Sequence, residues 1–171
     1  RMRIDSSGNV GIGKVPPTDA HATWSQLFLG EKGSYISEKS NSGGVYGNFV
    51  TDNLYIDADT GAFANITTDQ SSAYRQEAGV HHWYSQASGS AGAAVTLSEK
   101  MRIDSSGNVL VGQSSSTAVG AGNTTTGFSI RNDGGLYASR SSGPTITANA
   151  NADGDIIKLY KSGTTVGSIG V

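Results

Sequence analysis

The sequence predicts an all-β chain made of small β modules, of β-sandwich or β-prism type, joined by repeated β-hairpins. The nine residues Met2–Val10 recur without change as Met101–Val109, so the chain contains an internal repeat. Short runs of alternating apolar and polar residues recur along the chain, and glycine, asparagine, aspartate or serine separates them. No segment keeps a 3.6-residue apolar period over a helical length. These observations favour an array of β-units that support one another.

The first hairpin repeat is expected over residues 1–19. Met2 and Ile4 alternate with charged side chains, which predicts a strand with one apolar face. Residues 6–9 are Ser-Ser-Gly-Asn, and this is turn chemistry because glycine and asparagine tolerate positive φ. A second strand follows the turn. Pro16-Pro17 ends the unit, since proline cannot donate to a strand ladder.

An aromatic-rich β module is expected over residues 20–99. Ten of the 13 aromatic residues lie between Trp24 and Tyr84. Ser71–Ala78 is the one stretch whose pattern allows a short helix, although its apolar period is poor. Strands are expected at Gln26–Leu29, Tyr35–Glu38, Val45–Val50, Leu54–Ile56, Val80–Ser85 and Ala94–Ser98.

The second copy of the hairpin is expected over residues 100–113. Residues 114–171 then combine a Gly/Ser/Thr-rich connector with a second β module. Turn pairs such as Gly134-Gly135 and Ser162-Gly163 separate the strand candidates of this module. Those candidates are Phe128–Arg131, Leu136–Arg140, Thr145–Asn149, Asp155–Lys161 and Thr164–Ile169.

The composition excludes several classes of protein and points to self-association. The formal net charge of -2 argues against a nucleic-acid partner, and the absence of cysteine excludes disulfides and thiolate metal sites. No apolar run is long enough for membrane insertion through a helix. Leu, Ile, Val and Phe together number only 33 of 171 residues. A chain so poor in large aliphatic residues has difficulty burying a core alone, and we expect further copies of the chain to complete it.

Three segments carry a likeness to a known family. The run Lys100–Val109, followed by Leu-Val-Gly, resembles the repeat of bacteriophage tail-fibre proteins, especially those of marine phages. Tyr74–Trp83 looks like the module that often precedes this repeat in them. Asp153–Ile157 and Tyr160–Gly170 are similar to the stretch that these fibres carry ahead of a C-terminal self-cleaving chaperone. The chaperone itself is not in the sequence, and we expect the chain to be a segment of a longer polypeptide.

The resemblance implies an elongated, β-rich homotrimeric fibre with three parallel chains about one axis. It implies a virion location, contacts with other tail-fibre or baseplate proteins, and attachment to a bacterial surface through a host glycan. Two alternatives remain open at this point. One is a glycan-cleaving tailspike domain, and the other is a secreted bacterial adhesin with the same repeats.

Residues of the two hairpin repeats are candidates for packing at the trimer axis. Apolar side chains on one strand face would fill the axis in layers, and glycines would let three backbones approach one another. The alternative is that these residues pack within the sheet of their own chain, because alternation does not reveal which partner covers a face. The candidates are Met2, Ile4, Gly11, Ile12, Met101, Ile103 and Gly112.

The sequence predicts no enzyme, cofactor or metal site. Gly8–Lys14 resembles a phosphate-binding loop, but prolines follow it where such a loop needs a helix. His81 and His82 are neighbours and face opposite sides of a strand, so a metal would need one histidine from each of three chains. Four carboxylates are read as solvated, since nothing pairs them across a sugar: Glu31, Glu38, Asp52 and Glu77. Aromatic residues that are candidates for glycan contact are Trp24, Tyr46, Tyr55 and Trp83.

Overall fold

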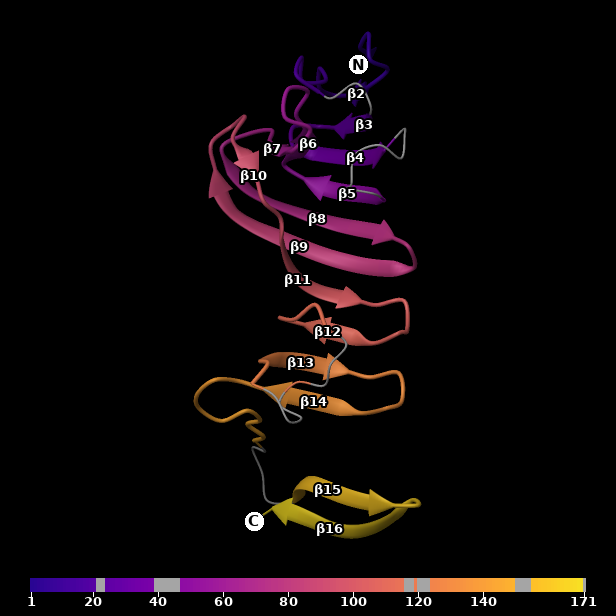
Figure 1. Cartoon of the computed structure of the whole chain (residues 1–171), viewed down its shortest axis with the longest axis vertical. Helices are drawn as coiled ribbons and strands as arrows, with labels where there is room; N and C mark the ends of the chain where they lie inside the picture. Colours follow the sequence, from indigo (N-terminus) through magenta and orange to yellow (C-terminus); the bar gives the residue numbers. More distant parts are fainter. Residues whose placement is uncertain (21–23, 39–46, 116–118, 120–123, 150–154, 171) are drawn as a thin grey trace.

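The computed structural model describes residues 1–20, 24–38, 47–115, 119, 124–149 and 155–170. All secondary structure in these residues is extended, and no helix occurs among them, so the all-β prediction is confirmed. One large mixed sheet is accompanied by two small antiparallel sheets. Figure 1 shows the strands stacked along the longest axis of the molecule and running across it.

The large sheet has eleven strands, and their order follows the chain with only two interruptions. All neighbouring pairs are antiparallel except β2 and β3, which are parallel because the chain crosses back over the sheet between them. Its members, in spatial order, are β1 (Met2–Ile4), β2 (Val10–Ile12), β3 (Trp24–Leu29), β4 (Gly33–Glu38), β5 (Asn48–Asp52), β8 (Asp69–Glu77), β9 (Val80–Gly89), β11 (Ser98–Ile103), β12 (Val109–Val111), β13 (Gly127–Ile130) and β14 (Leu136–Ser139).

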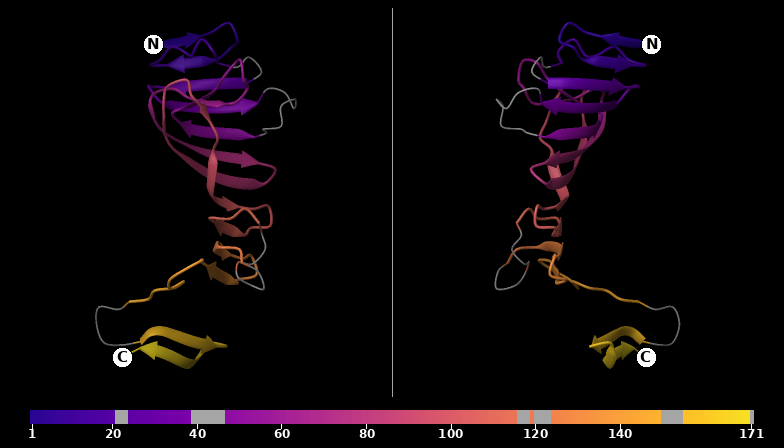
Figure 2. Two further views of the ribbon diagram at one scale, coloured as in Figure 1. Left: turned by 60° about the vertical axis from the view of Figure 1, so that its left-hand side comes forward. Right: turned by 90° about the vertical axis from the view of Figure 1, so that its right-hand side faces the viewer.

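The two interruptions form a small sheet that packs on one face of the large one. It contains β6 (Leu54–Ile56), β7 (Phe63–Asn65) and β10 (Ala94–Val95). Its apolar residues meet the inward side chains of β3, β4 and β5, among them Trp24, Ile36 and Phe49. Figure 2 shows this layer on one side of the large sheet only. The chain therefore has a packed core around its middle strands, and none of the described residues forms such a layer on the opposite face of the sheet.

Polar side chains join the two layers. The amide of Gln26 accepts a hydrogen bond from the Ile56 N–H at 2.9 Å and donates one to the Ile56 carbonyl at 3.3 Å. Ser34 donates to the carbonyl of Leu54 at 2.6 Å. Buried polar groups are tolerated only when they are paired in this way. These bonds fix the position of the small sheet on the large one.

The repeated motif folds as a hairpin with an internal clamp in both copies. In the second copy, Asp104 Oδ1 accepts the backbone N–H groups of Ser106 and Asn108, and Asp104 Oδ2 accepts the Asn108 side-chain amide. Asp5 and Asn9 make the same bonds in the first copy. Both asparagines are buried, with 0% and 3% of their surface exposed. The side-chain carbonyl of each asparagine points away from its own turn: that of Asn9 accepts the N–H of Gln26 in β3, and that of Asn108 accepts the N–H of Asn132, just after β13.

A third hairpin, between β13 and β14, repeats the backbone geometry of the first two. Arg131 N–H donates to the Gly135 carbonyl at 2.8 Å, as Asp104 N–H donates to the Asn108 carbonyl at 3.0 Å. Gly134 has a φ of 88°, close to the 85° of Gly107. The sequence reveals this relation poorly, because Arg131 and Gly135 replace the aspartate and asparagine of the motif. Its strand β14 is the last of the large sheet.

One expectation for secondary structure is wrong, and one open question is answered. The stretch whose pattern allowed a short helix, Ser71–Ala78, lies almost wholly in strand β8, where pairing with β5 and β9 fixes an extended backbone. The strand expected at Thr145–Asn149 is absent: residues 145–149 are irregular and exposed, and lie after the last strand of the large sheet. A separate hairpin follows, formed by β15 (Asp155–Lys161) and β16 (Thr164–Gly170).

Candidate functional site: an uncovered apolar face

The strand register places apolar residues of all eleven strands on one face of the large sheet. Met2 lies opposite Ile12, which lies beside Leu29. In the middle of the sheet, Tyr35 lies opposite Val50. The same row continues to the last strand. We call this set the apolar stripe, and it consists of Met2, Ile4, Val10, Ile12, Leu27, Leu29, Tyr35, Val50, Tyr74, Trp83, Met101, Ile103, Val109, Val111, Phe128, Ile130, Leu136 and Ala138.

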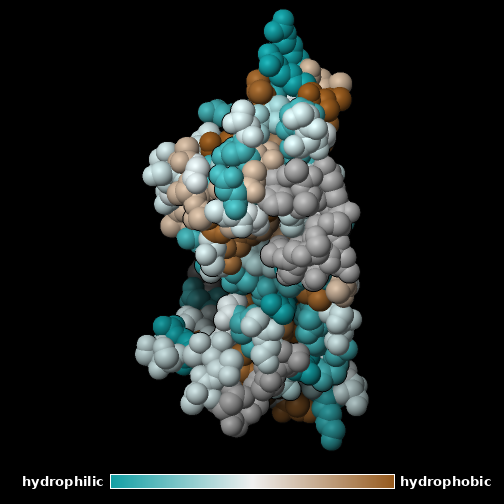
Figure 3. All heavy atoms as spheres, turned by 45° about the horizontal axis from the view of Figure 1, so that its top comes forward, coloured by the Kyte–Doolittle hydropathy of each residue, from teal (hydrophilic) through white to brown (hydrophobic). Residues whose placement is uncertain are grey.

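The stripe is exposed to solvent toward both ends of the sheet and half-buried on β8, β9 and β11. Met2 is 66% exposed, Val50 57% and Leu136 59%, and these residues come from the first, fifth and last strands of the sheet. Every large apolar side chain that is exposed within the strands of the large sheet belongs to the stripe. None of the stripe residues is charged. Figure 3 shows hydrophobic side chains at the surface near the N-terminal end of the molecule, beside hydrophilic ones.

The stripe is long as well as continuous. Neighbouring strands in a sheet are about 4.8 Å apart, so eleven strands extend over roughly 50 Å. Soluble monomers seldom expose a contiguous apolar surface of this extent, and such surfaces mark interaction sites. The opposite face of the same sheet is covered in its middle by β6, β7 and β10. The arrangement is thus two-sided, with a closed core on one face and an open apolar row on the other.

Five of the residues proposed from sequence for axis packing lie on the stripe. They are Met2, Ile4, Ile12, Met101 and Ile103. Gly11 lies on the other face, where a Cβ atom would come within 2.2 Å of the Lys14 carbonyl oxygen. Gly112 has a φ of 68° and no atom near the position of a Cβ. The structure therefore gives both glycines a reason within their own chain: close packing for Gly11 and backbone conformation for Gly112.

Sequence reasoning missed most of the stripe. Leu29, Tyr35, Val50 and Leu136 are as exposed as the proposed residues and lie in the same row. The sequence signal that could have identified these residues is the alternation within each strand, which predicts an apolar face for every strand separately. Only the pairing register shows that these faces coincide, because a shift by one residue would turn a strand over.

An aromatic group lies in the middle of the stripe. Tyr74 packs against Trp83 with ring centroids 5.2 Å apart and stacks on His81 at 5.9 Å. The Tyr74 hydroxyl is also hydrogen-bonded to His81 Nδ1. His81 is thereby on the stripe side of β9, so it is the histidine that faces any second copy packed there. Of the two neighbouring histidines considered as metal ligands, only His81 therefore faces the side on which other copies of the chain would pack.

His82 belongs to an ion cluster on the opposite face. Its Nδ1 is 2.7 Å from Glu99 Oε2, and Arg102 holds the same carboxylate with two bonds of 2.6 and 2.7 Å. Burial raises the pKa of Glu99, but the hydrogen bonds from Arg102 and His82 lower it further, so the net pKa lies below its ordinary value. All partners of this carboxylate lie within the chain. The cluster therefore ties β9 to β11.

The proposed glycan-contact residues lie in different surroundings in the structure. Trp24 is 5% exposed and packs in the core against Phe49, so it offers little surface to a ligand. Trp83 is half-buried on the stripe. Tyr55 is 3% exposed, with its hydroxyl bonded to Asp19 at 2.6 Å. Tyr46 lies outside the described residues.

The described residues show no cluster of metal-ligating side chains. No three or more histidine or carboxylate side chains among them are arranged to hold a metal ion. Of the carboxylates considered from sequence, Glu77 is ion-paired with Arg75, and Asp52 ends strand β5 at the surface. No helix in the described part of the chain is long and apolar enough to cross a membrane.

Comparisons with protein-family models, with curated proteins and with solved structures return no match to this chain.

Proposed function

We propose that the chain is a non-enzymatic structural segment of a bacteriophage tail fibre, in which three copies pack their apolar stripes together around a common axis. The observation that supports this proposal most strongly is the stripe, because it crosses every strand of the sheet and is exposed on eight of the eleven. Three large sheets would then form the walls of an elongated β-prism. The repeated hairpins and the resemblance of the sequence to phage fibres agree with this arrangement.

The energetics of the stripe favour association. Complete burial of one large apolar side chain contributes about 1.5–3 kcal/mol. Ten stripe residues are between 36% and 66% exposed, so covering them contributes roughly 10 kcal/mol per chain. Association costs about 4–15 kcal/mol in lost translation and rotation. The two amounts are comparable before the half-buried stripe residues are counted, and the stripe can therefore sustain an assembly.

In the proposed fibre the segment acts by rigid display. Its place is the virion, where other tail-fibre or baseplate proteins adjoin it and a host-surface glycan is its target. A single weak contact with a glycan is strengthened when three chains and several fibres bind together. A secreted adhesin would use the same physics, and the two are separated by whether antibodies to the chain label phage particles.

Light scattering on the purified chain tests the assembly. We expect a mass three times the 17.6 kDa of one chain. Val50→Asp should abolish the trimer, because each copy would bring a charge into the buried axis. Ser90→Asp introduces the same charge in an exposed turn away from the stripe and should leave the mass unchanged. A folded wild-type monomer, or a trimer that tolerates Val50→Asp, would refute the proposal.

The non-enzymatic part of the proposal has its own test. Incubation of the trimer with host-envelope polysaccharide should leave the chain length of the polymer unchanged. A reproducible fall in polymer size, lost on heat denaturation of the protein, would instead favour a tailspike enzyme.

A further inference from the structure

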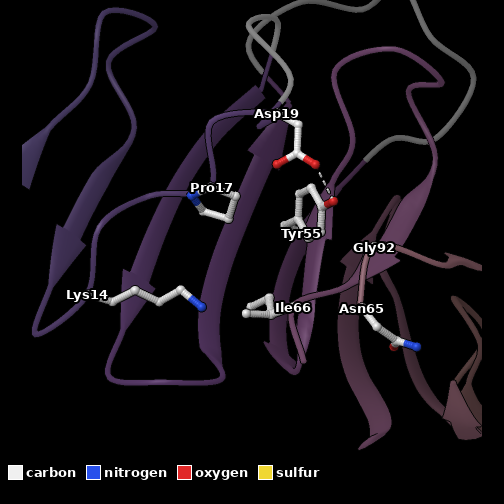
Figure 4. A pocket seen from close by; sticks show the side chains of 7 residues that line it. All are labelled: Lys14, Pro17, Asp19, Tyr55, Asn65, Ile66 and Gly92. Atoms are coloured by element: carbon white, nitrogen blue, oxygen red, sulfur yellow. Dashed lines mark hydrogen bonds between the residues drawn. The ribbon is translucent and has the colours of Figure 1, made fainter. Parts of the chain in front are cut away.

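A hollow of about 300 Å³ lies on the side of the molecule away from the stripe. Lys14, Pro17, Asp19, Tyr55, Asn65, Ile66 and Gly92 line it. Figure 4 shows the Lys14 side chain extending toward Ile66, with the Asp19–Tyr55 pair at the other end and Pro17 between them. The side chain of Asn65 points away from this group. The hollow is therefore bounded by one cation, one carboxylate and an apolar wall.

The register fixes the side of the sheet on which this hollow opens. Gly11 and its neighbour Phe28 face the side opposite to Val10, Ile12 and the rest of the stripe. The loop that carries Lys14 and Pro17 crosses over Gly11, and Tyr55 packs in the same cluster as Phe28. In a fibre with the stripes at its axis, each chain would present this hollow on its outer surface. Three equivalent hollows would then surround the axis.

The polar groups of the hollow are held in place and retain bonding capacity. Tyr55 donates its hydroxyl hydrogen to Asp19 Oδ2 at 2.6 Å, which orients the carboxylate. A carboxylate has about four acceptor positions, so Asp19 can still accept hydrogen bonds from a ligand. Lys14 Nζ donates one of its three hydrogens to the Glu31 carbonyl at 2.9 Å and has others to give. Acceptor and donor are thus fixed on opposite sides of an apolar wall.

We propose that this hollow binds one neutral pyranose unit of a host-surface polysaccharide, an inference that rests on the proposed fibre function. A pyranose ring has a rim of hydroxyl groups and an apolar face of C–H groups. Asp19 would accept bonds from neighbouring hydroxyls, Lys14 would donate to another oxygen, and Pro17 and Ile66 would contact the C–H face. Binding sites for small molecules combine apolar walls with a few fixed polar groups in this way. Lys14 and Asp19 together give the hollow no net charge, which fits a sugar that carries no charge of its own.

The two hairpin repeats supply an internal comparison. Lys14 follows Gly13 in the first copy, and Gln113 follows Gly112 at the same position of the second copy. Pro16 and Pro17 have no counterpart in the second copy, where serines follow. The motif shared by both copies therefore does not account for the hollow. The hollow is instead formed with residues that differ between the two copies, namely Lys14 and Pro17.

Methyl-detected heteronuclear NMR on the labelled wild-type trimer tests the site, with maltotriose, mannotriose and galactotriose as neutral probes and trigalacturonate as the charged one. At least one neutral probe should bind and shift the methyl signal of Ile66. Asp19→Asn should weaken binding about tenfold or more, as loss of a charged hydrogen-bond partner does. Lys14→Gln, which copies the second repeat, should weaken it several-fold. Asp59→Asn makes the same change as Asp19→Asn in an exposed turn and should leave affinity unchanged.

Light scattering on the same samples shows whether each one is a trimer, and the two measurements are interpreted together. An intact trimer that binds no neutral probe, or binds one without a shift at Ile66, overturns the saccharide site and leaves the fibre proposal standing. Preferred binding of trigalacturonate also overturns it. A monomeric chain refutes the fibre proposal, while sugar binding by that monomer would still support the hollow as a saccharide site. If Asp19→Asn fails to fold, the Ile66 shift in the wild-type protein decides.

Discussion

At the scale of single residues, Asn108 makes hydrogen bonds in two directions. Its amide nitrogen donates to Asp104, and its carbonyl oxygen accepts the backbone N–H of Asn132 in the next hairpin at 3.0 Å. Asn9 does the same in the first copy, where its carbonyl oxygen accepts the N–H of Gln26 at 3.2 Å. Each motif therefore shapes its own turn and holds the following strand. The shared geometry gives a physical reason for the unchanged Asp-Ser-Ser-Gly-Asn in both copies.

Replacing Asn108 with alanine should therefore destabilise the protein. The substitution leaves Asp104 Oδ2 and the N–H of Asn132 without the Asn108 side chain, which costs about 1–3 kcal/mol of unfolding free energy. Urea denaturation at fixed protein concentration measures the change. Ser106→Ala is the control, because Ser106 contributes its backbone N–H to the clamp and alanine keeps that group. Equal stability of the two variants would contradict the clamp.

Glu99 predicts how the protein responds to acid. Its folded-state pKa lies below the ordinary value of 4.5, so its contribution to stability is complete above that pH and is lost as the pH falls through the lower folded value. Glu99→Gln should lower the unfolding free energy at neutral pH by about 2 kcal/mol. The variant should also lose less stability than the wild type as the pH falls below the ordinary pKa of a glutamate. Parallel loss in both proteins, measured by urea titrations across this range, would exclude the role of this carboxylate.

At the scale of elements, the two copies of the hairpin differ most at one central position. The first copy has Gly11 there, beneath the Lys14 carbonyl and Pro16, and the second has Leu110, which is 1% exposed. The same hairpin thus accommodates a crossing loop in one place and fills the space with a side chain in the other. The difference explains why β2 is followed by a parallel strand, since the crossing loop carries the chain back over the sheet.

Opposite substitutions at this position should both be harmful. Gly11→Ala would overpack the crossing loop and cost about 1–3 kcal/mol. Leu110→Ala would open a cavity and cost about 2–5 kcal/mol. Thermal unfolding of the two variants beside Ser90→Ala, an exposed turn position, measures both effects. A Gly11→Ala variant as stable as the wild type would show that the loop moves aside easily.

The elements were predictable where the pattern is local. The two hairpins, strands such as Leu54–Ile56 and the apolar residues Met2 and Ile103 follow from alternation and turn chemistry. Strand β8 and the parallel pair of β2 and β3 did not follow, because partners distant in sequence decide them. Tyr55 was proposed for sugar contact, but Asp19 and Lys14 were not, since only folding brings them to the same hollow. The sequence pattern does not reveal the strand register or the crossing of the loop after β2, and these two features decide which residues meet.

At the scale of the whole molecule, the large sheet separates two surfaces. One surface carries the apolar stripe, and the other carries the small sheet, the ion cluster of Glu99 and the hollow near Asp19. In hairpin β15–β16, Ile157, Leu159 and Ile169 share one face and are 37–60% exposed. An assembly that buries one side of every sheet would leave the other side for contact with the host.

The absence of cysteine allows a direct test of this arrangement. A single cysteine at Val50 should form disulfide-linked dimers quickly on mild oxidation, because copies of the same stripe residue meet near a three-fold axis. A single cysteine at Ser90, on an exposed turn, should remain monomeric on non-reducing gels. Efficient cross-linking at Ser90 with none at Val50 would refute the proposal that the three-fold axis lies on the stripe side of the sheet.

The stacking of strands across the long axis has a mechanical consequence (Figure 1). Tension applied end to end would act along the backbone hydrogen bonds between neighbouring strands, and not along the covalent chain. The bonds of one strand pair share that load, so the shortest pairs carry the most force per bond. The three-residue strands β1, β2 and β12 are therefore where a pulled segment should yield first, at the two repeated hairpins.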